Sequence, residues 1–94
     1  MNSIKQEFMN KGITRGGLLL LSSEEAINMI HRCQEQGIVV LGIDGFKLTD
    51  YTTQPLMEQS IDLTKADCSN VWTKAESFLA AYIDSELYFE VVID

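Results

Sequence analysis

The sequence has 94 residues, of which 46% are hydrophobic and 22% are charged, and these values are those of an ordinary globular protein. A chain of this length has room for one domain, which we expect to span residues 1–94, and its composition excludes a disordered chain. The formal net charge is −7, which argues against binding to nucleic acid or to an anionic membrane because both need clustered lysine and arginine.

The negative charge is concentrated in the second half of the chain. Residues 1–47 hold five basic and five acidic side chains, whereas residues 48–94 hold two lysines and nine acidic side chains. This distribution is compatible with a basic partner protein. The alternative is that the acidic side chains only keep the protein soluble.

Two stretches predict helices from their capping signals. Ser3 to Gln6 fits a capping box and predicts a short helix that begins at Ile4 and stops by Gly12. The segment 22–25 (Ser-Ser-Glu-Glu) fits the same box, and apolar residues then recur at helical spacing. We therefore predict a helix over residues 23–36 that ends at Gly37 in the left-handed conformation.

The rest of the chain alternates strand and helix signals. The apolar run 38–43 predicts a central strand, and Asp44-Gly45 predicts a two-residue hairpin turn into residues 46–49, or else a tight turn into a longer excursion. The polar stretch 52–55, with the single proline, predicts a loop, and 61–63 predicts a short strand. A helix capped by Ser69 or Asn70 follows, with an apolar face from 71 to 83, and 87–93 predicts a final strand.

These elements indicate an α+β fold with a small, mainly antiparallel sheet packed with about three α-helices. The strands 38–43 and 87–93 are expected to be neighbours near the centre of the sheet. Trp72, Phe78 and Phe89 are the candidate aromatic core residues.

Catalytic and metal-binding signals are weak. His31 is the single histidine and lies two residues from Cys33 on a predicted helix, so the two side chains point in different directions. A Cys–His nucleophile pair would need Cys68 to be brought to His31 by the fold. Neither cysteine belongs to a C-x-x-C motif, and we expect both to be reduced thiols. The prediction is a protein that is not an enzyme and that uses no cofactor or metal.

The first ten residues lack an apolar stretch, and the longest apolar runs are far too short to span a bilayer. We therefore expect neither a signal peptide nor a membrane anchor. The expected location is the cytoplasm.

The strongest candidate for a functional surface lies in the middle of the chain. Acidic side chains are spread there between predicted elements, interleaved with Phe46, Tyr51 and Met57. Loops carry recognition more often than the framework does, and aromatic residues ringed by charges are typical of interfaces. The alternative is a solvated acidic loop whose aromatic residues fold into the core. The residues predicted to bind a partner are Asp44, Phe46, Asp50, Tyr51, Glu58, Asp62 and Asp67.

Several segments resemble bacterial toxin-immunity proteins, the small inhibitors encoded beside contact-dependent growth inhibition toxins, other polymorphic toxins and nuclease colicins. The resemblance is carried by Val-Leu-Gly-Ile-Asp-Gly-Phe at 40–46, Gln-Pro at 54–55, Ser-Ile-Asp-Leu at 60–63, Trp72 and Leu-Tyr-Phe-Glu-Val-Val at 87–92. It implies a cytoplasmic inhibitor that forms a heterodimer with one cognate toxin domain. Many such toxins are nucleases with a basic active site, which the inhibitor would cover.

A second hypothesis belongs to a different class of protein. A small α+β module could be a structural or regulatory subunit that packs into a larger assembly through an apolar face. The observation behind it is the run Leu18–Leu21, which could form an exposed apolar patch.

Overall fold

The computed structural model describes residues 4–65 and 69–93. In chain order the elements are α1 (Ile4–Phe8), β1 (Ile13–Arg15), β2 (Leu18–Ser22), α2 (Ser23–Gln36), β3 (Val40–Leu48), β4 (Thr53–Asp62), α3 (Val71–Ala80) and β5 (Tyr88–Ile93). The predicted α+β class is confirmed, with three helices and one five-stranded sheet in the described part of the chain.

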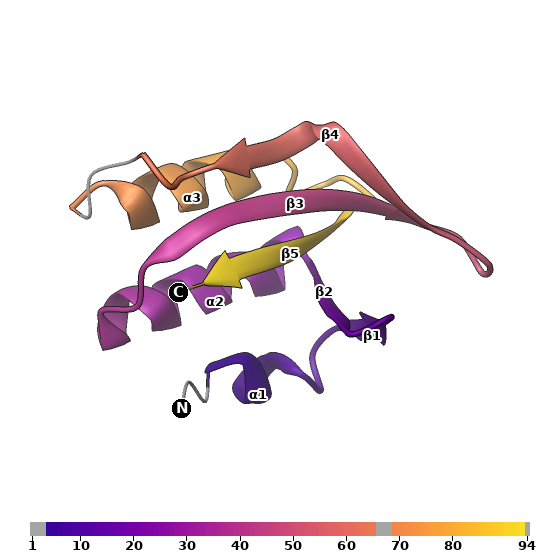
Figure 1. The fold of residues 1–94 in the computed structure, drawn as a ribbon, viewed down its shortest axis with the longest axis horizontal. Helices are drawn as coiled ribbons and strands as arrows, with labels where there is room; N and C mark the ends of the chain where they lie inside the picture. Colours follow the sequence, from indigo (N-terminus) through magenta and orange to yellow (C-terminus); the bar gives the residue numbers. More distant parts are fainter. Residues whose placement is uncertain (1–3, 66–68, 94) are drawn as a thin grey trace.

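The strands lie in the order β1-β2-β5-β3-β4, and every neighbouring pair is antiparallel. The strands predicted over 38–43 and 87–93 correspond to β3 and β5, which are neighbours as expected, with β5 at the centre. Helices α2 and α3 lie together on one face of this sheet (Figure 1). Alternation along β3 and β5 sends Ile43 and Val91 toward the helices, and Asp44, Glu90 and Val92 toward the opposite side. We call this opposite side the open face.

The core lies between the helices and the sheet. Met29, Ile30 and Cys33 of α2 are buried in it together with Leu79 of α3 and Phe89 of β5. Of the predicted aromatic core residues, Phe89 is fully buried, whereas Trp72 and Phe78 are partly buried and pack against the core. The indole Nε1 of Trp72 donates a hydrogen bond to the carbonyl oxygen of Ile38 at 2.9 Å.

The two ends of α2 follow the sequence signals. The Ser22 hydroxyl accepts a hydrogen bond from the Glu25 amide at 3.3 Å, as an N-cap side chain does. Gly37 has φ 69°, and its amide bonds to the carbonyl oxygens of Cys33 and Gln34. The predicted bounds of this helix, including the left-handed glycine, are confirmed. Helix α1 begins at Ile4 as predicted but ends at Phe8, before Gly12.

The predicted turn at Asp44-Gly45 is wrong, because β3 continues through both residues to Leu48. A two-residue turn of this type needs positive φ at both positions, but the described residues with positive φ are Gly16, Gly17 and Gly37. The sheet needs the glycine for a different reason: a Cβ on Gly45 would lie 2.4 Å from the carbonyl oxygen of Gln59. The hairpin turn instead lies at residues 49–52, between β3 and β4.

Strand β4 replaces both the loop predicted at 52–55 and the short strand predicted at 61–63. It is the edge strand of the sheet, which is where proline is tolerated, and Pro55 lies opposite Phe46 of β3. A bulge interrupts the pairing, because Ile43 faces Ile61 while Gly45 faces Leu56. One residue of β3 therefore lies opposite the segment 57–60 of β4.

The β1–β2 hairpin is an element that the sequence reasoning did not predict. Its turn is Gly16-Gly17, with φ 56° and 84°, which is a dipeptide that favours a tight hairpin turn. Strand β2 then buries Leu19, Leu20 and Leu21. The expected exposed patch at Leu18–Leu21 is therefore wrong, and the structural-subunit hypothesis loses the observation on which it was based. No helix within the described ranges is long and apolar enough to cross a membrane.

Candidate functional site

The 49–52 turn at the end of the β3–β4 hairpin is tightly hydrogen-bonded. The Thr49 amide donates to the Thr52 carbonyl oxygen at 3.0 Å. The Thr49 hydroxyl oxygen accepts from the amides of Tyr51 at 3.3 Å and Thr52 at 3.0 Å. The two threonine hydroxyls are also 2.7 Å apart. This turn is therefore stabilised by hydrogen bonds to its own threonine side chains.

A residue far away in the sequence braces the same turn. The Arg15 guanidinium, at the end of β1, donates through Nη1 to the carbonyl oxygens of Thr49 at 2.6 Å and Thr52 at 3.0 Å. A charged donor makes stronger hydrogen bonds than a neutral one. Arg15 thus ties the β1–β2 hairpin to the turn of the β3–β4 hairpin.

An exposed aromatic residue sits on this braced turn. The Tyr51 side chain is 95% exposed, and Asp50 beside it is also exposed. The other aromatic candidate, Phe46, is only 7% exposed and cannot serve as a projecting anchor. An aromatic side chain that is held out by a rigid turn is a typical hot spot of protein–protein interfaces.

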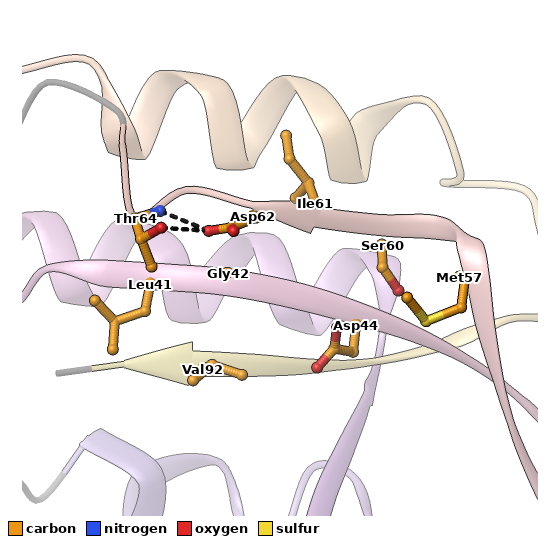
Figure 2. Close-up of a pocket in the computed structure, with 9 residues that line it drawn as sticks. All are labelled: Leu41, Gly42, Asp44, Met57, Ser60, Ile61, Asp62, Thr64 and Val92. Atoms are coloured by element: carbon orange, nitrogen blue, oxygen red, sulfur yellow. Dashed lines mark hydrogen bonds between the residues drawn. The ribbon is translucent and has the colours of Figure 1, made fainter.

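A groove of about 510 Å³ lies on the open face at the other end of the hairpin (Figure 2). Its lining residues come from three adjacent strands and the segment after β4, and they include Leu41, Asp44, Met57, Ser60, Asp62 and Val92. We call this feature the acidic groove. The β4 bulge forms part of its wall: the Ser60 hydroxyl donates to the Leu56 carbonyl oxygen at 2.9 Å and accepts from the Gly45 amide at 3.3 Å.

Three carboxylates lie in or beside the acidic groove. Asp44 faces Glu90 across the β3–β5 pair, and Asp62 faces Gly42 across the β3–β4 pair. Burial raises the pKa of Glu90, while the charge of Lys5 opposes this shift and that of Asp44 adds to it. Hydrogen bonds from the Thr64 hydroxyl at 2.6 Å and the Thr64 amide at 2.9 Å lower the pKa of Asp62.

The ion pairs found within residues 4–65 and 69–93 lie elsewhere on the molecule. Arg32 of α2 pairs with Glu7 at 2.9 Å and with Glu35 at 2.5 Å, and His31 Nε2 lies 3.2 Å from Glu76, a contact that is an ion pair only when the imidazole is protonated. The hydrogen bonds from Arg32 lower the pKa of Glu7. The carboxylates of the β3–β4 hairpin, in contrast, have no ion-pair partner among the described residues. Their charge is therefore available to a binding partner.

The structure divides the predicted partner-binding residues into two groups along the hairpin. Asp44 and Asp62 lie together in the acidic groove, and Asp50 and Tyr51 lie together on the 49–52 turn. Glu58 is exposed on the bulge between them. Asp67 lies outside the described residues. The hydrophobic residue that projects beside the groove is Met57, which is 84% exposed.

Of the groups considered for catalysis, the two that the structure describes, Cys33 and His31, are not arranged as a nucleophile and base. Cys33 is fully buried, and burial raises the pKa of its thiol to about 11. His31 is exposed on the same helix and pairs with Glu76. In the part of the chain that the structure describes, no group of three or more histidine, cysteine or acidic residues is placed to hold a metal ion. Cys68 lies outside this part.

A comparison with models of protein families gives no match, and a search of curated proteins finds no matching relative.

Proposed function

We propose that this chain is an immunity protein that binds a cognate toxin domain in the cytoplasm and neutralises it. The observation that carries the proposal is the β3–β4 hairpin, which presents Tyr51 on a braced turn and holds the carboxylates of Asp44, Asp50, Glu58 and Asp62 against a single lysine. The resemblance of segments 40–46, 60–63 and 87–92 to immunity proteins agrees with it.

A nuclease of the RNase type is the toxin that this surface fits best. Nuclease clefts are basic because they bind phosphates, and carboxylates can take the place of those phosphates. Tyr51 supplies a large apolar contact with few rotatable bonds, so that little conformational entropy is lost on binding. The inhibitor would then cover the active site without performing any chemistry, and it would need no cofactor.

The decisive experiment uses the toxin-like reading frame that this proposal places beside the gene. Co-expression of the chain should restore growth to cells that produce the toxin, and the two proteins should elute as a one-to-one complex in size-exclusion chromatography with light scattering. Tyr51→Ala should lower the affinity by about thirtyfold or more, as expected for an interface hot spot. Ile83→Ala, which changes another exposed apolar residue, is the control and should bind normally.

Two results would contradict the proposal: the absence of a toxin-like reading frame beside the gene, or a toxin that kills equally well with and without the chain. A complex that forms with unchanged affinity in Tyr51→Ala would place the interface away from the 49–52 turn.

A further inference from the structure

The acidic groove combines an apolar lining with two carboxylates on the open face of the sheet. Leu41 and Val92 line it from β3 and β5, and Met57 projects beside it from the bulge of β4 (Figure 2). A lysine or arginine side chain has an apolar stem and a charged end, and it typically lies along apolar surface with its charge at a polar site. The lining therefore suits a long basic side chain better than a wholly apolar or an anionic group.

The positions of the carboxylates favour a guanidinium over an ammonium group. Asp62 lies opposite Gly42, and Asp44 is two residues further along β3 on the same face. This diagonal relation places the two positions about 7–8 Å apart. A planar guanidinium with five N–H donors can bond to two separate carboxylates at once, whereas an ammonium group is a compact point charge.

Both carboxylates have acceptor oxygens to offer. Asp44 is half-buried, and its side chain makes no hydrogen bond or ion pair within the described residues. Asp62 uses Oδ1 to accept from Thr64, which fixes the orientation of the carboxylate and leaves Oδ2 available. A cation between them would also offset the repulsion between Asp44 and Glu90, which face each other across β3 and β5.

We propose that the acidic groove receives an arginine side chain of a basic partner protein, whose guanidinium binds between Asp44 and Asp62. The inference rests on the proposed function for the identity of that partner. A second copy of this chain does not fit, because its two arginines are already engaged: Arg15 with the 49–52 turn, and Arg32 with Glu7 and Glu35.

One partner can occupy the groove and the 49–52 turn together. Four residues of strand β3 lead from Asp44 to Leu48, a distance of about 13 Å at the usual rise of a strand, and Asp50 lies in the turn that follows. A typical interface buries about 800 Å² on each partner, which corresponds to a patch about 30 Å across. The groove would then hold one arginine at one end of the interface, while Tyr51 forms the anchor at the other.

The first test needs no natural partner. N-acetyl-arginine amide is titrated into the ¹⁵N-labelled protein, and the neutral analogue N-acetyl-citrulline amide serves as the matched ligand control. The arginine probe should shift the amide signals of Gly42, Asp44 and Asp62, with a dissociation constant of about 1–10 mM for so small a ligand. The double variant Asp44→Asn/Asp62→Asn should weaken binding at least about fivefold. Glu24→Gln, which changes an exposed carboxylate on α2, should bind as the wild type does.

The proposal is overturned if the arginine probe leaves the groove signals unmoved, or if citrulline shifts them equally. The second test measures the affinity for the neighbour-encoded toxin, which should fall at least about tenfold in the double variant but not in Glu24→Gln. If the toxin binds the wild type and the double variant equally well, the groove is not an arginine site of this interface, while the proposed function still stands. If the arginine probe binds in the groove but no toxin-like reading frame lies beside the gene, the arginine site is supported and the proposed function is contradicted.

Discussion

At the scale of single residues, the most informative contact is the one that Arg15 makes with the 49–52 turn. Its guanidinium donates to two carbonyl oxygens that are 34 and 37 residues away in the sequence. These carbonyls belong to Thr49 and Thr52, which frame the exposed Tyr51. Arg15 therefore acts as a positioning residue, because it holds the turn without being part of the surface that the turn presents.

The first prediction concerns the loss of these two hydrogen bonds. Arg15→Met keeps an apolar stem but loses both hydrogen bonds, so the 49–52 turn should become more mobile. Amide hydrogen exchange at residues 49–52 should accelerate, and the free energy of unfolding should fall by only about 1 kcal/mol, since the contact is at the surface. Arg32→Met is the control, because Arg32 binds Glu7 and Glu35 and should leave exchange in the turn unchanged. Equal exchange of the turn in wild type and Arg15→Met would show that its threonine hydrogen bonds are sufficient.

The second prediction concerns the charge of Glu90, a residue that is partly buried. Burial raises its pKa above the ordinary value of 4.5, although Lys5 opposes the shift and Asp44 adds to it. A raised pKa in the folded state means that this group favours folding below its ordinary pKa, and that this contribution is lost as the pH rises through the folded value. At pH 7 the charged carboxylate therefore lowers stability.

Glu90→Gln removes this charge and should raise the melting temperature at pH 7. The gain should shrink as the pH falls through the raised pKa of the folded state, and it should be gone below 4.5, where the carboxyl is protonated in both the folded and the unfolded protein. Glu86→Gln, at an exposed position shortly before β5, is the matched control and should show no comparable gain. A melting temperature of Glu90→Gln that is lowered at pH 7 would mean that attraction by Lys5 outweighs the effect of burial.

At the scale of elements, the bulge in β4 shapes the acidic groove, and it depends on Gly45. The bulge brings the carbonyl oxygen of Gln59 over the α-carbon of Gly45, while the Ser60 hydroxyl bonds the Gly45 amide. The result is a strand that bends at the point where Met57 and Glu58 are exposed. Bulges of this kind redirect side chains at the edges of sheets.

The third prediction tests this dependence. In Gly45→Ala the new Cβ would lie 2.4 Å from the backbone oxygen of Gln59, so the bulge must move. We expect a loss of about 1–3 kcal/mol in the free energy of unfolding, as for other overpacked sites. Chemical shifts should change at residues 57–60 but not in α2. Gly16→Ala tests the glycine of the other hairpin: it would meet no neighbouring atom and should be affected only by its positive φ. If Gly45→Ala is as stable as the wild type, the bulge can shift to accommodate the new Cβ without a loss in the free energy of unfolding.

The elements that could be predicted are those whose signals are local. Helix α2 is bounded by a serine cap and a left-handed glycine, which act within a few residues, and both were found. Asp44-Gly45 carries an equally strong local signal for a turn, but here tertiary pairing decides the outcome, because β5 and β4 extend the strand through it. Strand β4 is polar and contains a proline, so its edge position could be known only after its neighbours were placed.

The candidate site residues that could be predicted from the sequence are likewise those with a local signal. Acidic residues of a mid-chain segment can be recognised as surface from composition, and Asp44, Asp50, Glu58 and Asp62 are indeed outside the core. Which face of a strand each one occupies depends on the register, and a bulge changes that register. Phe46 was therefore named beside Tyr51, although it is nearly buried. Arg15 was missed because its partners are distant in the sequence, although Gly16-Gly17 next to it marks a hairpin.

At the scale of the whole molecule, the net charge of −7 is expected to govern the rate of association with a basic partner. Charges at the rim of an interface mainly change the association rate, whereas buried charges mainly change the dissociation rate. The β3–β4 hairpin carries both exposed and partly buried charges. Asp50 and Glu58 are exposed on the turn and the bulge, whereas Asp44 is half-buried in the groove.

The last prediction separates these roles in kinetic measurements with the neighbour-encoded toxin. The association rate of the wild type should fall at least about tenfold between 10 mM and 500 mM salt, because screening shortens the range of the attraction. Asp50→Asn/Glu58→Gln should slow association and flatten this salt dependence. Asp44→Asn/Asp62→Asn should instead accelerate dissociation and lower the affinity at least about tenfold, because these two carboxylates line the groove that the partner would occupy. Glu24→Gln should change neither rate. If both pairs bind like the wild type at both salt concentrations, the hairpin is not the interface, and the acidic residues Asp84, Glu86 and Glu90 around the start of β5 become the next surface to test.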